Sequence, residues 1–193
     1  MLAFSDAFRS CSAEQLLKAS EKANIPKNVF QILHLDHSST SKVIADSRID
    51  HVLFTGSVSG GIEVKKAIGT RFIGAGLELG GKDPAYVRAD CNFDHAVETL
   101  VDGSYYNSGQ SCCGIERIYV DEKIFDNFVD AFKAQTEKYI LNNPMDNSTN
   151  LGPVVKLSAA NNIRTQVSKA LNNGAKNIID GSKFKIDNSE NCY

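Results

Sequence analysis

A pair of adjacent cysteines lies in a run of small and polar residues, Asn107 to Gly114, between a predicted helix and a predicted strand. A cysteine in such a loop can lie exposed at a cleft, where its thiolate is a strong nucleophile toward a carbonyl carbon. Adjacent side chains seldom share one environment, so we expect one of Cys112 and Cys113 to be reactive and the other to be packed. A single cysteine is more often a buried, inert thiol, and the loop alone does not decide between the two interpretations.

A carboxylate interrupts an apolar run upstream of these cysteines. Glu78 stands between Leu77 and Leu79 in a segment that predicts a buried strand. Burial disfavours the charged form of a carboxyl group, raises its pKa and suits it to act as a base or an acid near neutral pH. The alternative is a structural carboxylate that pairs with Lys82 or with another cation.

Small residues also occupy the junction between a predicted strand and the helix after it. The segment Phe54 to Gly61 reads Phe-Thr-Gly-Ser-Val-Ser-Gly-Gly. Backbone N–H groups at a helix N-terminus, with the helix dipole behind them, hold phosphate oxygens well. Gly56 and Gly61 permit close backbone approach, and Ser57 offers a hydroxyl group. The segment is not Gly-x-Gly-x-x-Gly, however, and a plain strand–turn–helix junction fits it equally well.

Composition and charge limit the other classes of function. The 193 residues have a formal net charge of −2, which gives no electrostatic basis for binding nucleic acid or an anionic membrane. No apolar stretch is long enough to span a bilayer, and residues 1–10 do not form a secretory signal, so we expect a cytoplasmic location. The five cysteines are an odd number without a Cys-x-x-Cys pair, and the four histidines are scattered. This pattern favours reduced thiols and predicts no metal site.

The elements that would position these residues alternate between strand and helix in the first half of the chain. We predict helices over residues 12–22, 39–45 and 62–68, with Ser12 as the N-cap of the first. We predict strands over residues 29–33, 51–54, 71–79 and 86–88. Such alternation with short connections is typical of an α/β fold with parallel sheets flanked by helices.

Beyond Asn92 the helices become longer. The pattern predicts an amphipathic helix over residues 93–106, entered near Asp94, and a strand over residues 115–120. Long helices are predicted over residues 122–140 and 156–171, and no element over residues 181–193. A boundary between two domains is predicted near the Gly80–Gly81 pair, because two glycines let the chain turn sharply.

The three motifs together resemble those of the NAD(P)-dependent aldehyde dehydrogenase family. Phe-Thr-Gly-Ser, Leu-Glu-Leu-Gly-Gly-Lys and Gly-Gln-Ser-Cys occur in the family's order, and Glu78 precedes Cys112 by the family's 34 positions. The resemblance implies that Cys112 is the nucleophile toward a small-molecule aldehyde and that Glu78 activates the water that hydrolyses the resulting thioester. It implies NAD or NADP as cofactor and a homo-oligomeric assembly. It also implies a cofactor-binding turn of six residues: Gly56, Ser57, Val58, Ser59, Gly60 and Gly61.

The resemblance covers only part of the family's pattern. It implies a truncated aldehyde dehydrogenase-like fold, with residues 1–79 as the C-terminal part of a Rossmann-like NAD(P)-binding domain and residues 80–193 as the N-terminal part of the catalytic domain. The family's ribose-contacting lysine is replaced by Phe4, and the acidic residue expected shortly after it by Ala7. We expect exposed sheet edges and apolar faces, and therefore poor solubility. The alternative to an active dehydrogenase is a catalytically inactive truncated paralogue or gene remnant, acting at most as a nucleotide-binding or interaction fragment.

Overall fold

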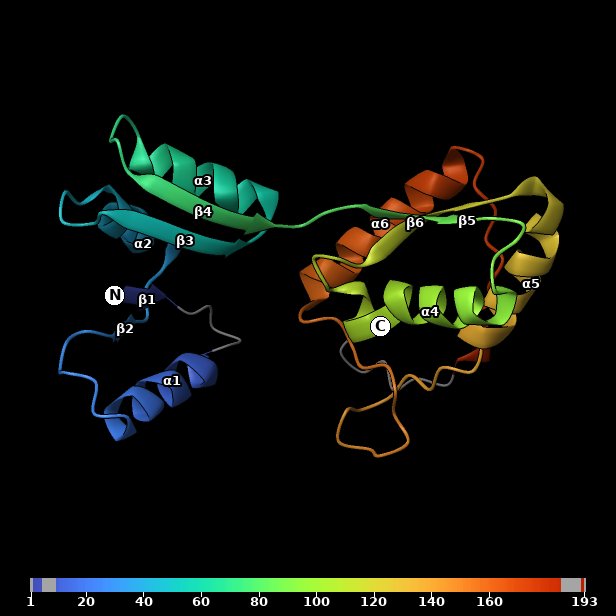
Figure 1. Ribbon diagram of the computed structural model, residues 1–193, viewed down its shortest axis with the longest axis horizontal. Coiled ribbons are helices and arrows are strands. Elements are labelled where there is room, and N and C mark those ends of the chain that lie inside the picture. The colour runs from blue at the N-terminus through green and yellow to red at the C-terminus, as the bar shows by residue number, and fades with distance from the viewer. Residues whose placement is uncertain (1, 5–9, 185–191, 193) are drawn as a thin grey trace. The chain divides into compact units, whose positions relative to one another are not determined.

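The computed structural model describes residues 2–4, 10–184 and 192 (Figure 1). The chain divides into two compact units, Met1–Leu79 and Gly80–Tyr193. Ala7, where the sequence departs from the family's pattern, lies outside the described residues. The roles of a cofactor domain and a catalytic domain, assigned above to residues 1–79 and 80–193, remain predictions.

The first unit contains two pairs of parallel strands. Strand β1 (Leu2–Phe4) pairs with β2 (Gln31–Leu33), and β3 (His51–Gly56) pairs with β4 (Gly74–Leu79). Parallel neighbours need a crossover connection. Helix α1 (Ser10–Lys22) lies between the first two strands in sequence, α2 (His37–Ala45) precedes β3, and α3 (Val58–Ile68) connects β3 to β4. Figure 1 shows α3 running along the β3–β4 pair.

Local capping and a small apolar core hold this unit together. Asp36 caps α2 by accepting a hydrogen bond of 2.7 Å from the Ser39 amide, and this bond lowers the pKa of the Asp36 carboxyl group. Ile44 of α2 and Val64 and Ile68 of α3 form the buried core. Phe54 and Leu77, from β3 and β4, pack against that core and fix the helices on the strands.

The second unit is built around one pair of parallel strands, β5 (Asp83–Val87) and β6 (Ile115–Val120). Helix α4 (Phe93–Tyr105) connects them, and it is followed by the 3-10 turn η1 (Tyr106–Gly109). After β6 come the 3-10 turn η2 (Glu122–Ile124), α5 (Phe125–Thr136), α6 (Leu157–Asn172) and the 3-10 turn η3 (Gly181–Lys183).

The core of the second unit lies where α4 and α5 meet the strand pair. Val87 of β5, Val97 and Val101 of α4, and Phe128 of α5 are buried together. The Phe93 ring meets the Phe128 ring edge to face, with 6.3 Å between the ring centroids. The helix connecting β5 to β6 is therefore firmly packed up to the point where the cysteine loop begins.

Several large apolar side chains are left exposed. Leu53 on β3 is 78% exposed and Phe72, just before β4, is fully exposed. In the second unit, Tyr86 and Tyr119 face each other in register on the outer face of the β5–β6 pair, and both are exposed. Apolar surface of this kind favours association. The poor solubility expected from the sequence stays a prediction.

Several helix boundaries differ from those predicted, and α2, for example, begins at His37 rather than at residue 39. Ser12 is not a cap, because α1 already begins at Ser10. Helix α3 begins at Val58 rather than at residue 62, since Ser57 supplies its cap. Helix α4 begins at Phe93 as predicted, and Asn92 caps it by accepting from the His95 amide. The helix predicted over residues 122–140 is shorter: the chain first forms η2, and α5 ends at Thr136.

Some strands are shorter than predicted and others are longer, as β3 is, which continues to Gly56 instead of ending at residue 54. Strand β2 begins at Gln31 rather than at residue 29, because Asn28 has a left-handed backbone with φ 69°. Strand β4 begins at Gly74, since the Arg71 guanidinium group before it donates hydrogen bonds to the carbonyl groups of Ile44 and Ile49. Strand β5 covers residues 83–87 where 86–88 was predicted. Residues 181–193, predicted to hold no element, contain η3.

Candidate active site

The predicted phosphate-binding segment forms the capped first turn of α3. Ser57 has an extended backbone, and its Oγ accepts a hydrogen bond of 3.1 Å from the Gly60 amide. The Ser57 carbonyl accepts from the Gly61 amide at 3.0 Å, and the hydroxyl groups of Ser57 and Ser59 lie 2.9 Å apart. The amides of Val58 and Ser59 precede the first intrahelical bond, so they are available to an anion at the positive end of the helix dipole.

The glycines of this segment have a packing role that sequence reasoning missed. A Cβ atom at Gly56 would come within 2.5 Å of the Phe54 ring, and one at Gly60 within 2.6 Å. A Cβ atom at Gly61 would come within 2.9 Å of the Leu79 side chain. These positions therefore need glycine to let β3, β4 and α3 pack, whether or not a cofactor approaches the backbone.

Glu78 does not occupy the environment that the sequence predicted. It lies on β4 and is exposed, whereas its neighbours Leu77 and Leu79 are half-buried. Alternate side chains of a strand point to opposite faces, so the face that packs against the α3 core excludes the carboxylate. The prediction of a buried Glu78 is wrong for this reason. Lys82, its suggested partner, instead donates to the Glu116 carboxylate.

The pairing of β3 and β4 brings Glu78 beside the segment that begins at Gly56. Thr55 lies opposite Glu78 in the parallel register, and Gly56 lies opposite Leu79. The carboxyl ends of the two strands thus lie side by side, with the capped turn of α3 directly after one of them. The cysteines belong to the other unit, Gly80–Tyr193.

Both cysteines are exposed in a tight turn. A hydrogen bond of 3.1 Å from the Gly114 amide to the Ser111 carbonyl closes a four-residue turn that has Cys112 and Cys113 at its centre. The central residues of such a turn direct their side chains away from its closing bond. The expectation that one of the two thiols would be packed is therefore wrong. Exposure alone does not distinguish them.

The backbone that leads into this turn is unusual. Asn107, Ser108 and Gly109 have left-handed φ angles of 52°, 57° and 72°. Tyr105, the last residue of α4, anchors the start of the turn: its ring packs against Phe132 and Tyr139, and its hydroxyl group is hydrogen-bonded to the Thr136 side chain. Burial raises the pKa of the Tyr105 hydroxyl group.

Contacts from two other segments, residues 152–155 and Gly81, hold the cysteine loop. The Ser108 hydroxyl donates to the Gly152 carbonyl at 2.6 Å, and the Gln110 carboxamide accepts from the Val155 amide at 2.9 Å. Gly81 lies against the loop as well, since a Cβ atom there would come within 3.1 Å of the Cys112 carbonyl oxygen. The loop is thus fixed at its start, middle and end.

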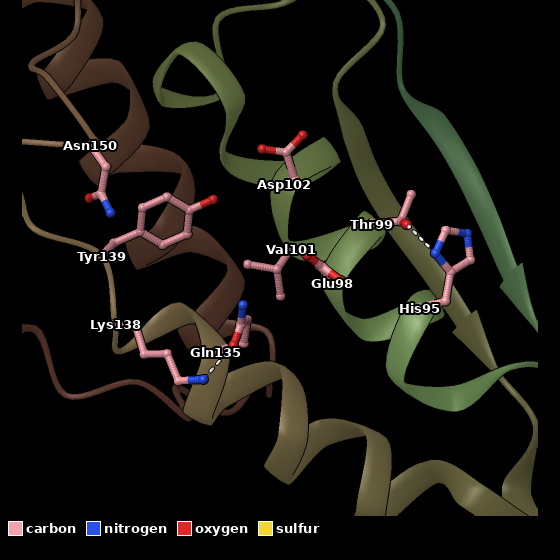
Figure 2. Close-up of a pocket in the computed structure, with 9 residues that line it drawn as sticks. All are labelled: His95, Glu98, Thr99, Val101, Asp102, Gln135, Lys138, Tyr139 and Asn150. Atoms are coloured by element: carbon pink, nitrogen blue, oxygen red, sulfur yellow. Dashed lines mark hydrogen bonds between the residues drawn. The ribbon is translucent and has the colours of Figure 1, made fainter.

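A polar groove of about 590 Å³ lies elsewhere in the second unit, between α4 and the end of α5 (Figure 2). Its charged groups include Glu98, Asp102 and Lys138, and Lys138 donates to the Gln135 carboxamide at 2.7 Å. Burial and the nearby Asp102 carboxylate raise the pKa of Tyr139. None of the residues predicted to be functional lines this groove. No pattern in the sequence indicates this groove, because its lining comes from segments far apart in the chain.

Two other features, a metal-binding cluster and a membrane-spanning helix, are absent from the described residues. No three histidine, cysteine, aspartate or glutamate side chains among them form a group that could hold a metal ion. Within residues 2–4, 10–184 and 192, no helix is long and apolar enough to cross a membrane.

Comparison with known proteins decides the family. The sequence model of the Aldehyde dehydrogenase family matches residues 6–193. The chain belongs to the aldehyde dehydrogenase family. The resemblance seen in the three motifs is thereby confirmed.

Two relatives illustrate the similarity in sequence. A succinate semialdehyde dehydrogenase (NAD(P)+) of Escherichia coli K12 is 33% identical over 172 residues, which cover 89% of this chain and 37% of that protein. A lactaldehyde dehydrogenase of Methanococcus aeolicus is 30% identical over 171 residues, covering 88% of this chain and 36% of that protein. This aldehyde dehydrogenase chain spans about a third of the length of the curated relatives it matches.

Solved structures confirm the predicted α/β fold. An NAD-dependent aldehyde dehydrogenase from Sinorhizobium meliloti matches with a TM-score of 0.92 and 27% identity, covering 100% of this chain and 38% of that chain. A glyceraldehyde-3-phosphate dehydrogenase from Methanocaldococcus jannaschii, complexed with NADP, matches with a TM-score of 0.85 and 29% identity, covering 93% of this chain and 40% of that one.

Proposed function

We propose that this chain contributes to NAD(P)-dependent oxidation of a small-molecule aldehyde to a carboxylic acid, with Cys112 as the nucleophile. The observation that carries the proposal is the exposed Cys112, held in a hydrogen-bonded turn within a Gly-Gln-Ser-Cys segment that resembles the family's motif. The alternative is a catalytically inactive chain that binds nucleotide or a protein partner. We further propose a homo-oligomer in the cytoplasm, with no part in binding nucleic acid or membranes.

The residues of the chain can be given roles in this reaction. The Cys112 thiolate attacks the aldehyde carbonyl, and the Cys112 backbone N–H stabilises the oxygen anion of the thiohemiacetal that forms. Loss of hydride leaves a thioester on Cys112. Glu78 then takes a proton from water as the water attacks the thioester, which releases the carboxylic acid and restores the thiol. Glu78 is exposed in its unit, so burial does not prepare it to act as a base. Its proposed role depends on its reaching the attacking water.

NAD or NADP, when bound, supplies the hydride acceptor for this reaction. The first turn of α3 fits the diphosphate group of such a cofactor, because the amides of Val58 and Ser59 and the Ser57 hydroxyl lie at the positive end of the helix dipole. The names of the relatives support both cofactors: the Escherichia coli enzyme is named for NAD(P)+, and the Methanocaldococcus structure holds NADP. We assign cofactor binding to residues 1–79 and the covalent chemistry to residues 80–193.

The direct test is formation of reduced nicotinamide by the purified 193-residue chain, supplied with a small aldehyde and either NAD or NADP. Steady formation that requires the aldehyde is expected, and carboxylic acid should appear in equal amount. A folded chain that forms no reduced nicotinamide with either cofactor would contradict the activity. If that chain still binds NAD or NADP in calorimetry, the nucleotide-binding alternative is correct.

The cofactor site can be tested separately from the stability of α3. Serine, aspartate and asparagine are all good N-caps, so Ser57→Asp and Ser57→Asn should both leave the unfolding transition within about 1 kcal/mol. The new carboxylate of Ser57→Asp repels a diphosphate, whereas the neutral amide of Ser57→Asn does not. We expect the Kd for NAD or NADP to rise at least about tenfold in Ser57→Asp only, which corresponds to about 1.4 kcal/mol. Equal affinity in the two variants would place the cofactor elsewhere.

A further inference from the structure

The turn before the cysteines carries a backbone conformation that is costly for most residues. Three consecutive residues, Asn107, Ser108 and Gly109, have left-handed φ angles. Glycine adopts this region freely and asparagine tolerates it, but left-handed helical geometry is unfavourable for serine, because its Cβ atom crowds the following carbonyl oxygen. Such geometry persists only where surrounding contacts impose it, and it concentrates at functional sites.

Two side chains of this turn make the contacts that impose it. The Ser108 hydroxyl donates to the Gly152 carbonyl. The Gln110 carboxamide acts in both directions: its Nε2 donates to the Asn107 carbonyl at 3.0 Å, and its Oε1 accepts from the Val155 amide at 2.9 Å. Ser108 and Gln110 thus attach the turn at two points to the segment 152–155, more than 40 residues further along the chain.

The two hydrogen bonds made by the Gln110 side chain require a glutamine at this position. Glutamate can accept from the Val155 amide but cannot donate to the Asn107 carbonyl. Asparagine is one methylene shorter, and lysine has no acceptor. Only a glutamine side chain of this length makes both bonds at once. Because its backbone amide also donates to the Asn107 carbonyl at 3.1 Å, Gln110 closes the left-handed turn while it holds the segment 152–155.

We propose that Gln110, supported by Ser108, is a positioning residue for the Cys112 nucleophile, acting through a two-point clamp between the cysteine loop and residues 152–155. This inference rests on the proposed function for its catalytic consequence. Cys112 follows Gln110 by two residues, and its carbonyl is packed against Gly81. The clamp and Gly81 thus hold the backbone that carries the thiol from two sides. A displacement of about 1 Å at a reacting group can cost about 100-fold in rate.

The test compares Gln110→Met, Gln110→Glu and the control Gln135→Met in the full chain. Methionine keeps the length of the side chain and removes both hydrogen bonds, while glutamate keeps the bond from Val155. Hydrogen exchange of the Val155 amide should accelerate on the order of tenfold in Gln110→Met, as expected for the loss of one hydrogen bond, and change less than about threefold in Gln110→Glu. Gln135, in the groove of Figure 2, contacts Lys138 and not the loop, so Gln135→Met should leave the Val155 amide unchanged.

The catalytic readout separates positioning from unfolding. Gln110→Met should lower kcat about 100-fold and leave KM within about threefold, because the substrate still binds while the nucleophile is misplaced. Gln110→Glu, which keeps the bond from Val155, should lose less of kcat than Gln110→Met. Cys112 should still react with iodoacetamide at close to the parent rate, since its exposure is unchanged. Unaltered Val155 exchange in Gln110→Met, or a kcat within threefold of the parent, overturns the inference. If the parent chain itself has no turnover, the proposed function fails, and the exchange pattern alone decides whether the clamp exists.

Discussion

Replacing Cys112 with alanine is expected to lower aldehyde oxidation by at least about four orders of magnitude, whereas Cys113→Ala should retain activity within about threefold. Removing a nucleophile eliminates the covalent route, and losses of that size are typical for enzymes of this kind. Cys113 is the matched control, because it is the adjacent residue of the same turn and is equally exposed. Initial rates of reduced nicotinamide formation by both variants, checked for equal unfolding transitions, give the measurement.

The same pair of cysteines allows a check that needs no turnover. If Cys112 is an activated thiolate, iodoacetamide should modify it near neutral pH faster than it modifies Cys113, even though both are exposed. Half-buried Cys91, which packs against the core of the second unit, should react more slowly still. Peptide mass spectrometry resolves the sites if the chain is cleaved after labelling. Equal rates at Cys112 and Cys113 would mean that neither thiol is activated in this chain.

The sequence predicts well where local pattern and tertiary packing agree. Strand β6 begins and ends at the predicted residues, because its β-branched and aromatic residues favour a strand and its ends are defined by Gly114 and Asp121. Phe128, within the helix predicted over residues 122–140, is buried in the core. The length of that helix was overestimated, since the apolar pattern continues beyond Thr136 while the chain turns away.

The site is less predictable, because its environment depends on distant contacts. An apolar run around Glu78 suggested burial, yet the period of two residues in a strand puts the carboxylate on the opposite face from Leu77 and Leu79. The attachment of Gln110 to Val155 joins residues 45 positions apart, and nothing local to either residue indicates it. Sequence motifs therefore predict which residues carry chemistry, while the contacts that position them are seen only in the fold.

Replacing Glu78 with glutamine should separate the two halves of the proposed reaction. The amide cannot take a proton from water, so the Cys112 thioester should form at close to the normal rate and then hydrolyse about 10²- to 10⁴-fold more slowly. Rapid mixing of enzyme, cofactor and aldehyde should give a burst of about one reduced nicotinamide per active chain, followed by slow turnover. The mass of the protein should show an acyl group on Cys112 during the slow phase.

A carboxylate of the same unit supplies the control for Glu78→Gln. Glu63 is exposed on α3 and pairs with Lys66 on the same helix, so Glu63→Gln changes the same charge with no expected effect on hydrolysis. A burst in Glu78→Gln but not in Glu63→Gln assigns water activation to the strand β4 carboxylate. Loss of the burst together with the steady rate would instead mean that Glu78 acts before the thioester forms, either on the thiol or on the bound aldehyde. Glu78 lies opposite Thr55 near the carboxyl ends of β3 and β4. In that case its role would be in the binding step at the end of these strands.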